Sequence, residues 1–237
     1  MKRFLIFTFI FSFIYVNAQT KCGADKIEEI LNIASNKRVA LIVNQTSVTE
    51  CGTHIVDTLI ARGVKINSIF APEHGFRGDA DAGESVKDGI DKKSGVKIIS
   101  LYGKNKKPNA EQLSDIDLIV FDIQDVGARF YTYSSTMYYA MQSAAEFGKE
   151  FLVLDRPNPN DYVDGAMLDM NLKSFVGTLP LPTMHGLTVG ELALMIKGEN
   201  WGNTKSLNLN IPKNEIRSIG NISVIKFIKA LLLLILN

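Results

Sequence analysis

Residues 118–154 read LIVFDIQDVGARFYTYSSTMYYAMQSAAEFGKEFLVL, in which two apolar runs flank a long helical segment. The runs LIVF (118–121) and FLVL (151–154) are short and uninterrupted, which is typical of strands that are buried on both faces of a sheet. Residues 132–147 are expected to form the helix, which ends before Gly148. A strand, a helix and a strand in this order indicate two parallel strands joined by a crossover connection.

The same alternation continues on both sides of this segment. Further strands are expected at 38–43 (RVALIV), 65–70 (KINSIF) and 97–101, and further helices at 53–62 and 189–197. This order predicts an α/β fold with a Rossmann-like, doubly wound, mostly parallel sheet covered by helices on both faces. The chain has 237 residues, is 46% hydrophobic and 22% charged, and can therefore bury the core of such a fold. Its net charge of +1 gives no indication of a nucleic-acid partner.

The N-terminal residues 1–18 have the three parts of a secretory signal peptide. Lys2 and Arg3 precede an apolar segment, and small Ala18 lies before the expected cleavage site at Gln19. We therefore expect an exported protein, periplasmic or secreted, without a stable membrane span after cleavage. Cys22 and Cys51 would then lie in an oxidising compartment, where a disulfide and two free thiols are equally open alternatives.

Residues 211–237 differ from the rest of the chain. They are rich in Ile, Leu, Asn and Lys and close on ALLLLILN (230–237), an apolar run too short to span a bilayer. One hypothesis is a frameshift or a premature end near residue 211, and the alternative is an ordinary last helix packed on the sheet. Residues 19–210 are expected to form one Rossmann-like catalytic domain.

Polar loops follow four of the predicted strands. They are NQTS (44–47), PEHGFRG (72–78), DIQDVGAR (122–129) and DRPNPN (155–160). Ordinary turn chemistry accounts for any one of these loops. The carboxyl ends of parallel strands share one edge of the sheet, so four such loops together favour a ligand site there.

The motifs of several site classes are missing from the sequence. It contains no GxGxxG, GxxxxGK[ST], HExxH or GxSxG motif and no paired-cysteine spacing, and His54, His74 and His185 are scattered along the chain. We therefore expect neither a cofactor nor a metal. The remaining carboxylates, arginines and tyrosines suit a glycan. Glycoside cleavage needs a carboxylic acid and often a second carboxylate, and arginine can pair with a carboxylate on a sugar.

Four longer motifs resemble the exo-β-N-acetylmuramidase family, the NamZ/YbbC-like glycoside hydrolases of peptidoglycan recycling. They are PEHGFRG (72–78), DIQDVGARFYTYSSTM (122–137), LDRPNP (154–159) and HGLTVGELA (185–193), with agreement also at NQTS (44–47) and SLYG (100–103). The resemblance implies hydrolysis of N-acetylmuramic acid from the non-reducing ends of peptidoglycan fragments, with a glycan or muropeptide as the partner. It also implies a smaller C-terminal domain that would begin near residue 211 and is largely missing here.

The resemblance also suggests roles for individual residues. Glu73 would be the catalytic acid beside His74, and Asp122 or Asp125 the second carboxylate. The expected substrate-binding residues are Asn44, Arg77, Gln124, Arg129, Tyr131, Tyr133, Asp155, Arg156, Asn158 and His185. The three arginines are candidates for the lactyl carboxylate of the sugar, with pairing to a neighbouring Asp as the alternative. Glu191 is expected to begin a helix instead of joining the site.

Two other functions remain open at this point. One is a catalytically incomplete domain that binds muropeptides, and the other is an α/β hydrolase that uses Glu73 and His74 on an ester or a phosphate. The stereochemical course is open as well, because the acetamido group of the sugar could itself serve as the nucleophile.

Overall fold

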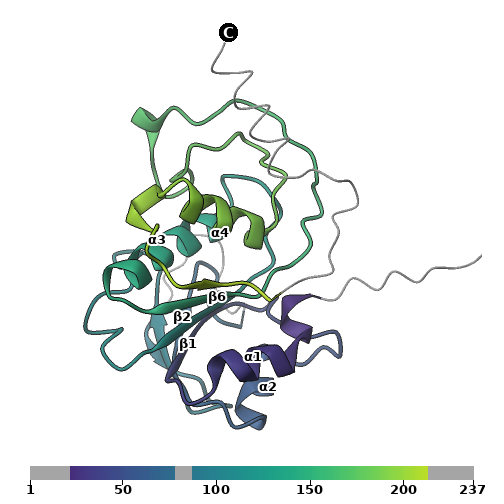
Figure 1. Ribbon diagram of the computed structural model, residues 1–237, viewed down its shortest axis with the longest axis vertical. Helices are drawn as coiled ribbons and strands as arrows, with labels where there is room; N and C mark the ends of the chain where they lie inside the picture. The colour runs from purple at the N-terminus through teal and green to yellow at the C-terminus, as the bar shows by residue number, and fades with distance from the viewer. Residues whose placement is uncertain (1–21, 78–86, 213–237) are drawn as a thin grey trace, which may run out of the picture.

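The computed structural model describes residues 22–77 and 87–212, and these form a sheet of seven strands between two layers of helices (Figure 1). The strand order is β3-β4-β2-β1-β5-β6-β7, and every strand runs parallel to its neighbours except β3, which is antiparallel to β4. The strands are β1 (Val39–Val43), β2 (Ile66–Ala71), β3 (Gly89–Ile90), β4 (Lys97–Ser100), β5 (Leu118–Asp122), β6 (Glu150–Val153) and β7 (Leu209–Asn210). The predicted doubly wound, mostly parallel α/β fold is confirmed.

The helices divide between the two faces of the sheet. Helices α1 (Ile27–Ala34) and α2 (Ile55–Ala61) cover one face, and α3 (Tyr133–Glu146) and α4 (Val189–Gly198) cover the other (Figure 1). Three short 3-10 helices, at Gly23–Asp25, Met170–Leu172 and Trp201–Asn203, lie outside this framework. The sequence analysis identified α2, α3 and α4 but missed α1, β3 and β7, of which the two strands have two residues each and are too short to show a periodicity.

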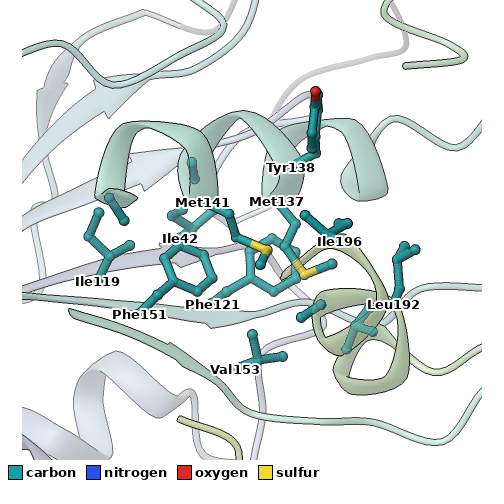
Figure 2. Packing of buried hydrophobic residues seen from close by; sticks show 14 of the residues in the cluster. Ile42, Ile119, Phe121, Met137, Tyr138, Met141, Phe151, Val153, Leu192 and Ile196 are labelled. Atoms are coloured by element: carbon teal, nitrogen blue, oxygen red, sulfur yellow. The ribbon is translucent and has the colours of Figure 1, made fainter. Parts of the chain in front are cut away.

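Each central strand contributes to a separate core on each face of the sheet. Successive side chains of a strand point to opposite faces. Phe121 and Phe151 pack with Met137 and Met141 of α3 in one core, as Figure 2 shows. The intervening residues Val120 and Leu152, with Leu41, belong to the other core beneath α1 and α2. Burial on both faces explains why these strands read as continuous apolar runs.

The strand order defines a topological switch point between β1 and β5. The chain leaves β1 for β2 on one side of it and later returns to β5 on the other side. The loops after these strands diverge at such a point and leave a crevice beyond their carboxyl ends, where α/β sheets bind ligands. Asn44 follows β1, and Asp125 lies shortly after β5.

Some expectations concern residues outside those the structure describes. The expected signal peptide (1–18) lies outside them, and so does the expected tail (211–237) except for Ile211 and Pro212. Cys22 and Cys51 are both free thiols here, which agrees with the second of the two alternatives. In the described part of the chain, no helix has the length and apolar character needed to cross a membrane.

Candidate active site

Glu73 lies in the turn that follows β2, at the edge where the polar loops were expected to gather. The backbone N–H of Gly75 donates to the Pro72 carbonyl at 3.0 Å and closes the turn, in which His74 has φ +70°. A positive φ is uncommon for a residue with a side chain, so this turn holds His74 in a conformation of raised energy. Glu73 and His74 are both half-buried, which leaves part of each side chain at the surface.

Two hydroxyl groups from other elements hold the Glu73 carboxylate. Thr132, the N-cap residue of α3, donates from Oγ1 to Glu73 Oε2 at 2.7 Å. The hydroxyl of Tyr102, in the loop after β4, also donates to Glu73, and this hydrogen bond raises the pKa of Tyr102. Three separate loops therefore meet at Glu73. The sequence analysis did not assign Tyr102 or Thr132 to the site, although the position of Tyr102 after a strand was a usable signal.

Tyr133, the first residue of α3, connects Glu73 with the switch point. Burial raises the pKa of Tyr133, the side chain of Asn44 opposes the rise, and the negative charges of Glu73 and Asp125 add to it. The neighbouring Tyr131 is largely exposed, and its ring packs against Phe130 with the centroids 5.7 Å apart. The structure thus brings together five of the expected residues, namely Asn44, Glu73, Asp125, Tyr131 and Tyr133.

Asp125 and His185 face each other inside the protein. Asp125 Oδ2 accepts from the Gly127 N–H at 2.9 Å and lies 3.6 Å from His185 Nε2. The other ring nitrogen of His185, Nδ1, accepts from the Leu187 N–H at 3.2 Å, so a neutral ring carries its proton on Nε2, towards Asp125. Both side chains are buried, with 3% and 1% exposure.

Asp122 and Arg156 form a buried ion pair instead of a binding surface. Arg156 donates to both oxygens of Asp122, at 2.6 and 3.0 Å, and to the Val48 carbonyl at 2.9 Å. Burial raises the pKa of Asp122, and the hydrogen bonds from Arg156 oppose this rise. Asp122 has no exposed surface. Because each side chain satisfies the other, these contacts favour the scaffold alternative for Asp122 and Arg156, and a role of either residue at the substrate stays a prediction.

Asp155 fastens α4 to the end of β6. Its Oδ1 accepts from the Gly190 N–H at 2.8 Å, and its Oδ2 from the Thr188 hydroxyl at 3.0 Å. Thr188 is the N-cap residue of α4 and forms a capping box with Glu191, which confirms that Glu191 begins this helix. These contacts give Asp155 a structural role at the N-terminus of α4, and its expected contact with substrate stays a prediction.

The remaining expected residues stabilise the loops around the site. Arg77 pairs with Asp91 at 3.0 and 2.9 Å and approaches Asp57 at 3.5 Å, so its guanidinium already faces two carboxylates. Gln124 donates to the carbonyls of Asp125 and Pro157, both at 2.7 Å. Asn158 donates to the Leu187 carbonyl at 2.9 Å. These contacts favour the scaffold alternative for Arg77 and give Gln124 and Asn158 structural partners.

Arg129 differs from the other two arginines. Its Nη1 donates to the backbone carbonyls of Ala166 and Leu181, at 3.0 and 2.6 Å. Across residues 22–77 and 87–212 it has no ion pair with a carboxylate, whereas Arg77 pairs with Asp91 and Asp57 and Arg156 pairs with Asp122. Across the same residues, no group of three or more His, Cys, Asp or Glu side chains is arranged to hold a metal ion.

Comparisons with known proteins agree on one family. The family model described as "Exo-beta-N-acetylmuramidase NamZ, N-terminal" matches residues 39–226 and so extends beyond residue 211, although the origin of the tail remains a hypothesis. The Bacillus subtilis (strain 168) protein named peptidoglycan beta-N-acetylmuramidase NamZ is 49% identical over 166 residues, which are 69% of this chain and 40% of that protein.

Two crystal structures of DUF1343 family proteins from Bacteroides fragilis NCTC 9343 have the same fold. One has a TM-score of 0.75 at 39% identity and is matched over 87% of this chain and 55% of its own. The other has a TM-score of 0.73 at 40% identity, over 82% of this chain and 50% of its own. The chain thus spans about half the length of these relatives. With the family model matched over most of its length, the chain belongs to the family of the exo-β-N-acetylmuramidase NamZ N-terminal domain.

Proposed function

We propose that this chain hydrolyses the β-glycosidic bond of N-acetylmuramic acid at the non-reducing end of peptidoglycan fragments. The observation that carries the proposal is the half-buried carboxylate of Glu73, which lies at the carboxyl edge of the sheet and is held by Thr132 and Tyr102. The name of the Bacillus subtilis relative, a peptidoglycan beta-N-acetylmuramidase, supports the same activity.

Glu73 is the general acid in this proposal. Glycoside cleavage needs a carboxylic acid that protonates the leaving oxygen, and that acid must be reachable from solvent and fixed in direction. The hydrogen bond from Thr132 engages Oε2 at 2.7 Å and restricts rotation of the carboxyl group. The exposed ring of Tyr131 offers a nearby surface on which a sugar ring can stack.

Arg129 is the best supported partner for the lactyl carboxylate. It is the arginine of the three that has no carboxylate partner in the described part of the chain. Its two bonds to the carbonyls of Ala166 and Leu181 fix one nitrogen of the guanidinium. The other nitrogens can then donate to a ligand carboxylate with no rearrangement of an existing ion pair.

The test is the release of 4-nitrophenol from 4-nitrophenyl β-N-acetylmuramic acid. We expect turnover of this compound and not of the N-acetylglucosamine analogue, which lacks the lactyl group. The Glu73→Gln variant should lose a factor of about 10²–10⁴ in kcat, the usual contribution of a general acid. An Arg129→Met variant should raise KM for the muramic substrate far more than it changes kcat.

Two other outcomes would contradict the proposal. Binding of N-acetylmuramic acid by the folded chain with no turnover would identify a binding domain. Hydrolysis of simple nitrophenyl esters or phosphates that depends on Glu73 would identify another hydrolase.

The proposal includes action outside the cytoplasm. Its support is the sequence pattern of residues 1–18, with Lys2 and Arg3 before an apolar segment. The mass and N-terminal sequence of the protein isolated from cell fractions would test this, with a start at Gln19 in the exported fraction as the expected result.

A further inference from the structure

Two buried polar atoms at the switch point have no hydrogen-bond partner among the described residues. They are Nδ2 of Asn44, after β1, and Oδ1 of Asp125, after β5. The side chains are 0% and 3% exposed, so bulk water does not satisfy these atoms. Buried polar groups in native proteins nearly always have partners, and an exception at a ligand-binding edge points to a group that binds there.

The surrounding contacts fix what each atom can do. Asn44 Oδ1 accepts from the N–H and the hydroxyl of Thr46, at 2.9 and 2.6 Å, so Nδ2 is left as a donor. The Asn44 side chain interacts with the Tyr133 hydroxyl and lowers its pKa, but Nδ2 does not meet the geometry of a hydrogen bond there. Asp125 Oδ2 accepts from the Gly127 N–H, so Oδ1 is left as an acceptor. Asn44 and Asp125 therefore offer one unused donor and one unused acceptor on opposite sides of the switch point, and His185 Nε2 beside Asp125 is a further buried atom without a partner among the described residues.

An acetamido group has the complementary pair, a carbonyl oxygen that accepts and an N–H that donates, in one rigid plane. A sugar hydroxyl also donates and accepts, but through a single oxygen atom, whereas an acetamido group presents its donor and its acceptor on two separate atoms held in one plane. The Tyr133 hydroxyl lies beside both residues. Tyr133 is only half-buried, so its side chain extends from these buried atoms towards the surface.

We propose that Asn44 and Asp125 bind the 2-acetamido group of the substrate and that the oxygen of this group is the nucleophile of the reaction. This inference rests on the function proposed above. Asn44 and the Tyr133 hydroxyl direct the acetamido carbonyl, and Asp125 Oδ1 accepts its N–H. His185 Nε2 lies 3.6 Å from Asp125 Oδ2, on the side of the carboxylate away from the proposed ligand contact, and has no hydrogen-bond partner among the described residues.

The other carboxylates at this edge support a nucleophile supplied by the substrate. Within the described loops, Asp122 is bound by Arg156 and Asp155 by α4. Asp125 accepts from the Gly127 N–H through Oδ2, and in this proposal its Oδ1 is engaged by the acetamido N–H and not by C1. Glu73 is half-buried and serves as the acid. Some glycosidases use the acetamido oxygen of the substrate in this situation.

The reaction then has two balanced steps. In the first, the acetamido oxygen forms a bond to C1, the glycosidic C1–O bond breaks, and the leaving oxygen takes the electron pair of that bond and the proton of Glu73. The N–H of the resulting oxazolinium ion stays hydrogen-bonded to the Asp125 carboxylate. In the second, water attacks C1 and gives its proton to Glu73. The bond between C1 and the oxygen of the oxazolinium ring breaks, and its electron pair returns to that oxygen, which restores the acetamido group. The product keeps the β configuration.

The first experiment varies the acetamido group of the nitrophenyl substrate. We expect kcat to fall with each fluorine in an N-acetyl, N-fluoroacetyl and N-difluoroacetyl series, because fluorine weakens the carbonyl oxygen as a nucleophile. The first product seen by proton NMR should be the β-anomer. Rates independent of fluorine, or an α-anomer as the first product, would overturn the inference while leaving the proposed hydrolase function intact.

The second experiment tests the residues. Asp125→Asn should lower kcat by about 10²–10³-fold, the usual effect of removing a preorganised electrostatic contact. The matched control Asp161→Asn replaces an exposed carboxylate and should leave kcat unchanged. Circular dichroism verifies that both variants are folded, and a folded Asp125→Asn protein with full kcat would contradict the assignment.

If the chain releases no nitrophenol, a binding experiment tests the inference instead. The thiazoline of muramic acid mimics the cyclic intermediate, so calorimetry should find that the unmodified chain binds it more tightly than N-acetylmuramic acid. Asp125→Asn should lose this preference, and Asp161→Asn should keep it. Equal affinity for the two ligands would overturn the inference alone, and binding of neither by the folded chain would overturn the proposed function as well.

Discussion

Two groups of polar residues lie at the same edge of the sheet, and they differ in how completely they are hydrogen-bonded. The first, which we name the anchor group, consists of Asp122, Asp155 and Arg156, all at most 8% exposed. Their side chains bind one another, α4 or the backbone. The second, the site group, consists of Asn44, Glu73 and Asp125. It keeps an unused donor, an unused acceptor and a half-buried carboxylate.

Residue type and position do not separate scaffold from site in this fold. Both groups contain carboxylates in loops after parallel strands, and sequence alone assigned both to the substrate. The hydrogen-bond partners separate them, because a fully paired group stabilises the fold and an unpaired one is available to a ligand.

The largest expected effect on stability comes from removing one partner of the anchor group. Asp122→Ala leaves Arg156 buried and unpaired, and loss of one partner of a buried ion pair costs about 3–5 kcal/mol. Urea unfolding measures this as a fall in the free energy of unfolding. In the control Glu146→Gln, which breaks an exposed pair with Lys107, the loss should be about 1 kcal/mol or less. Similar losses in the two variants would contradict the distinction.

A smaller effect is expected where α4 meets Asp155. A Cβ at Gly190 would lie 2.6 Å from Asp155 Cγ, so Gly190→Ala must displace this carboxylate from the N-terminus of α4. We expect a loss of about 1–3 kcal/mol, the usual cost of overpacking. Gly198→Ala, in the last turn of the same helix, meets nothing within 4 Å and should be neutral or raise the stability by about 0.5–1 kcal/mol. Chemical denaturation of both variants tests whether the cost depends on Asp155.

The sequence was sufficient for the fold because the decisive signals are local. Continuous apolar runs such as 118–121 and 151–154 predicted buried parallel strands, and the helix between them ends near its glycine as expected. The capping residues Thr188 and Glu191 likewise act within one turn of α4. Helix α1 was missed although it is amphipathic. The helix is short and the first strand follows soon after it, and no glycine marks its end.

The candidate site was only partly predictable, because its chemistry depends on contacts between distant parts of the chain. Motif resemblance identified Glu73, but nothing local distinguished Asp122, which pairs with Arg156, from Asp125, which does not. The hydrogen bond between Thr132 and Glu73 joins residues 59 positions apart. Such pairings arise from the packing of whole elements, and a single sequence without its fold does not contain them.

A pH effect is expected at His54, whose Nε2 lies 2.9 Å from the backbone carbonyl of Asn44 in the site group. Burial lowers the pKa of His54, the hydrogen bond to the Asn44 carbonyl opposes this, and the charge of Arg77 lowers the pKa further while Asp57 and Asp91 raise it. The unfolded chain therefore binds a proton near pH 6.5 before the folded chain does. The stabilisation is complete above that pH and is lost as the pH falls towards the lower folded pKa.

The measurement compares unfolding free energies at pH 7.5 and 5.5 for the unmodified chain and for His54→Asn. Asparagine can keep the N-cap interaction of α2 that the imidazole makes with the Val56 N–H. The unmodified chain should lose more stability than the variant between the two values. An equal loss would mean that His54 does not carry this pH dependence.

The smallest expected change in stability is at Glu73, and it completes the comparison with the anchor group. Glu73→Gln keeps the size of the side chain and leaves an oxygen that can accept from the Thr132 hydroxyl. We expect the free energy of unfolding to change by no more than about 0.5 kcal/mol, as for substitutions that disturb no buried network. The same variant should lose its turnover of the muramic substrate. A large loss of stability would place Glu73 with the anchor group and remove the physical reason for choosing it as the acid. Unchanged stability with lost turnover would mean that the fold gains little from this carboxylate and that its position serves the reaction.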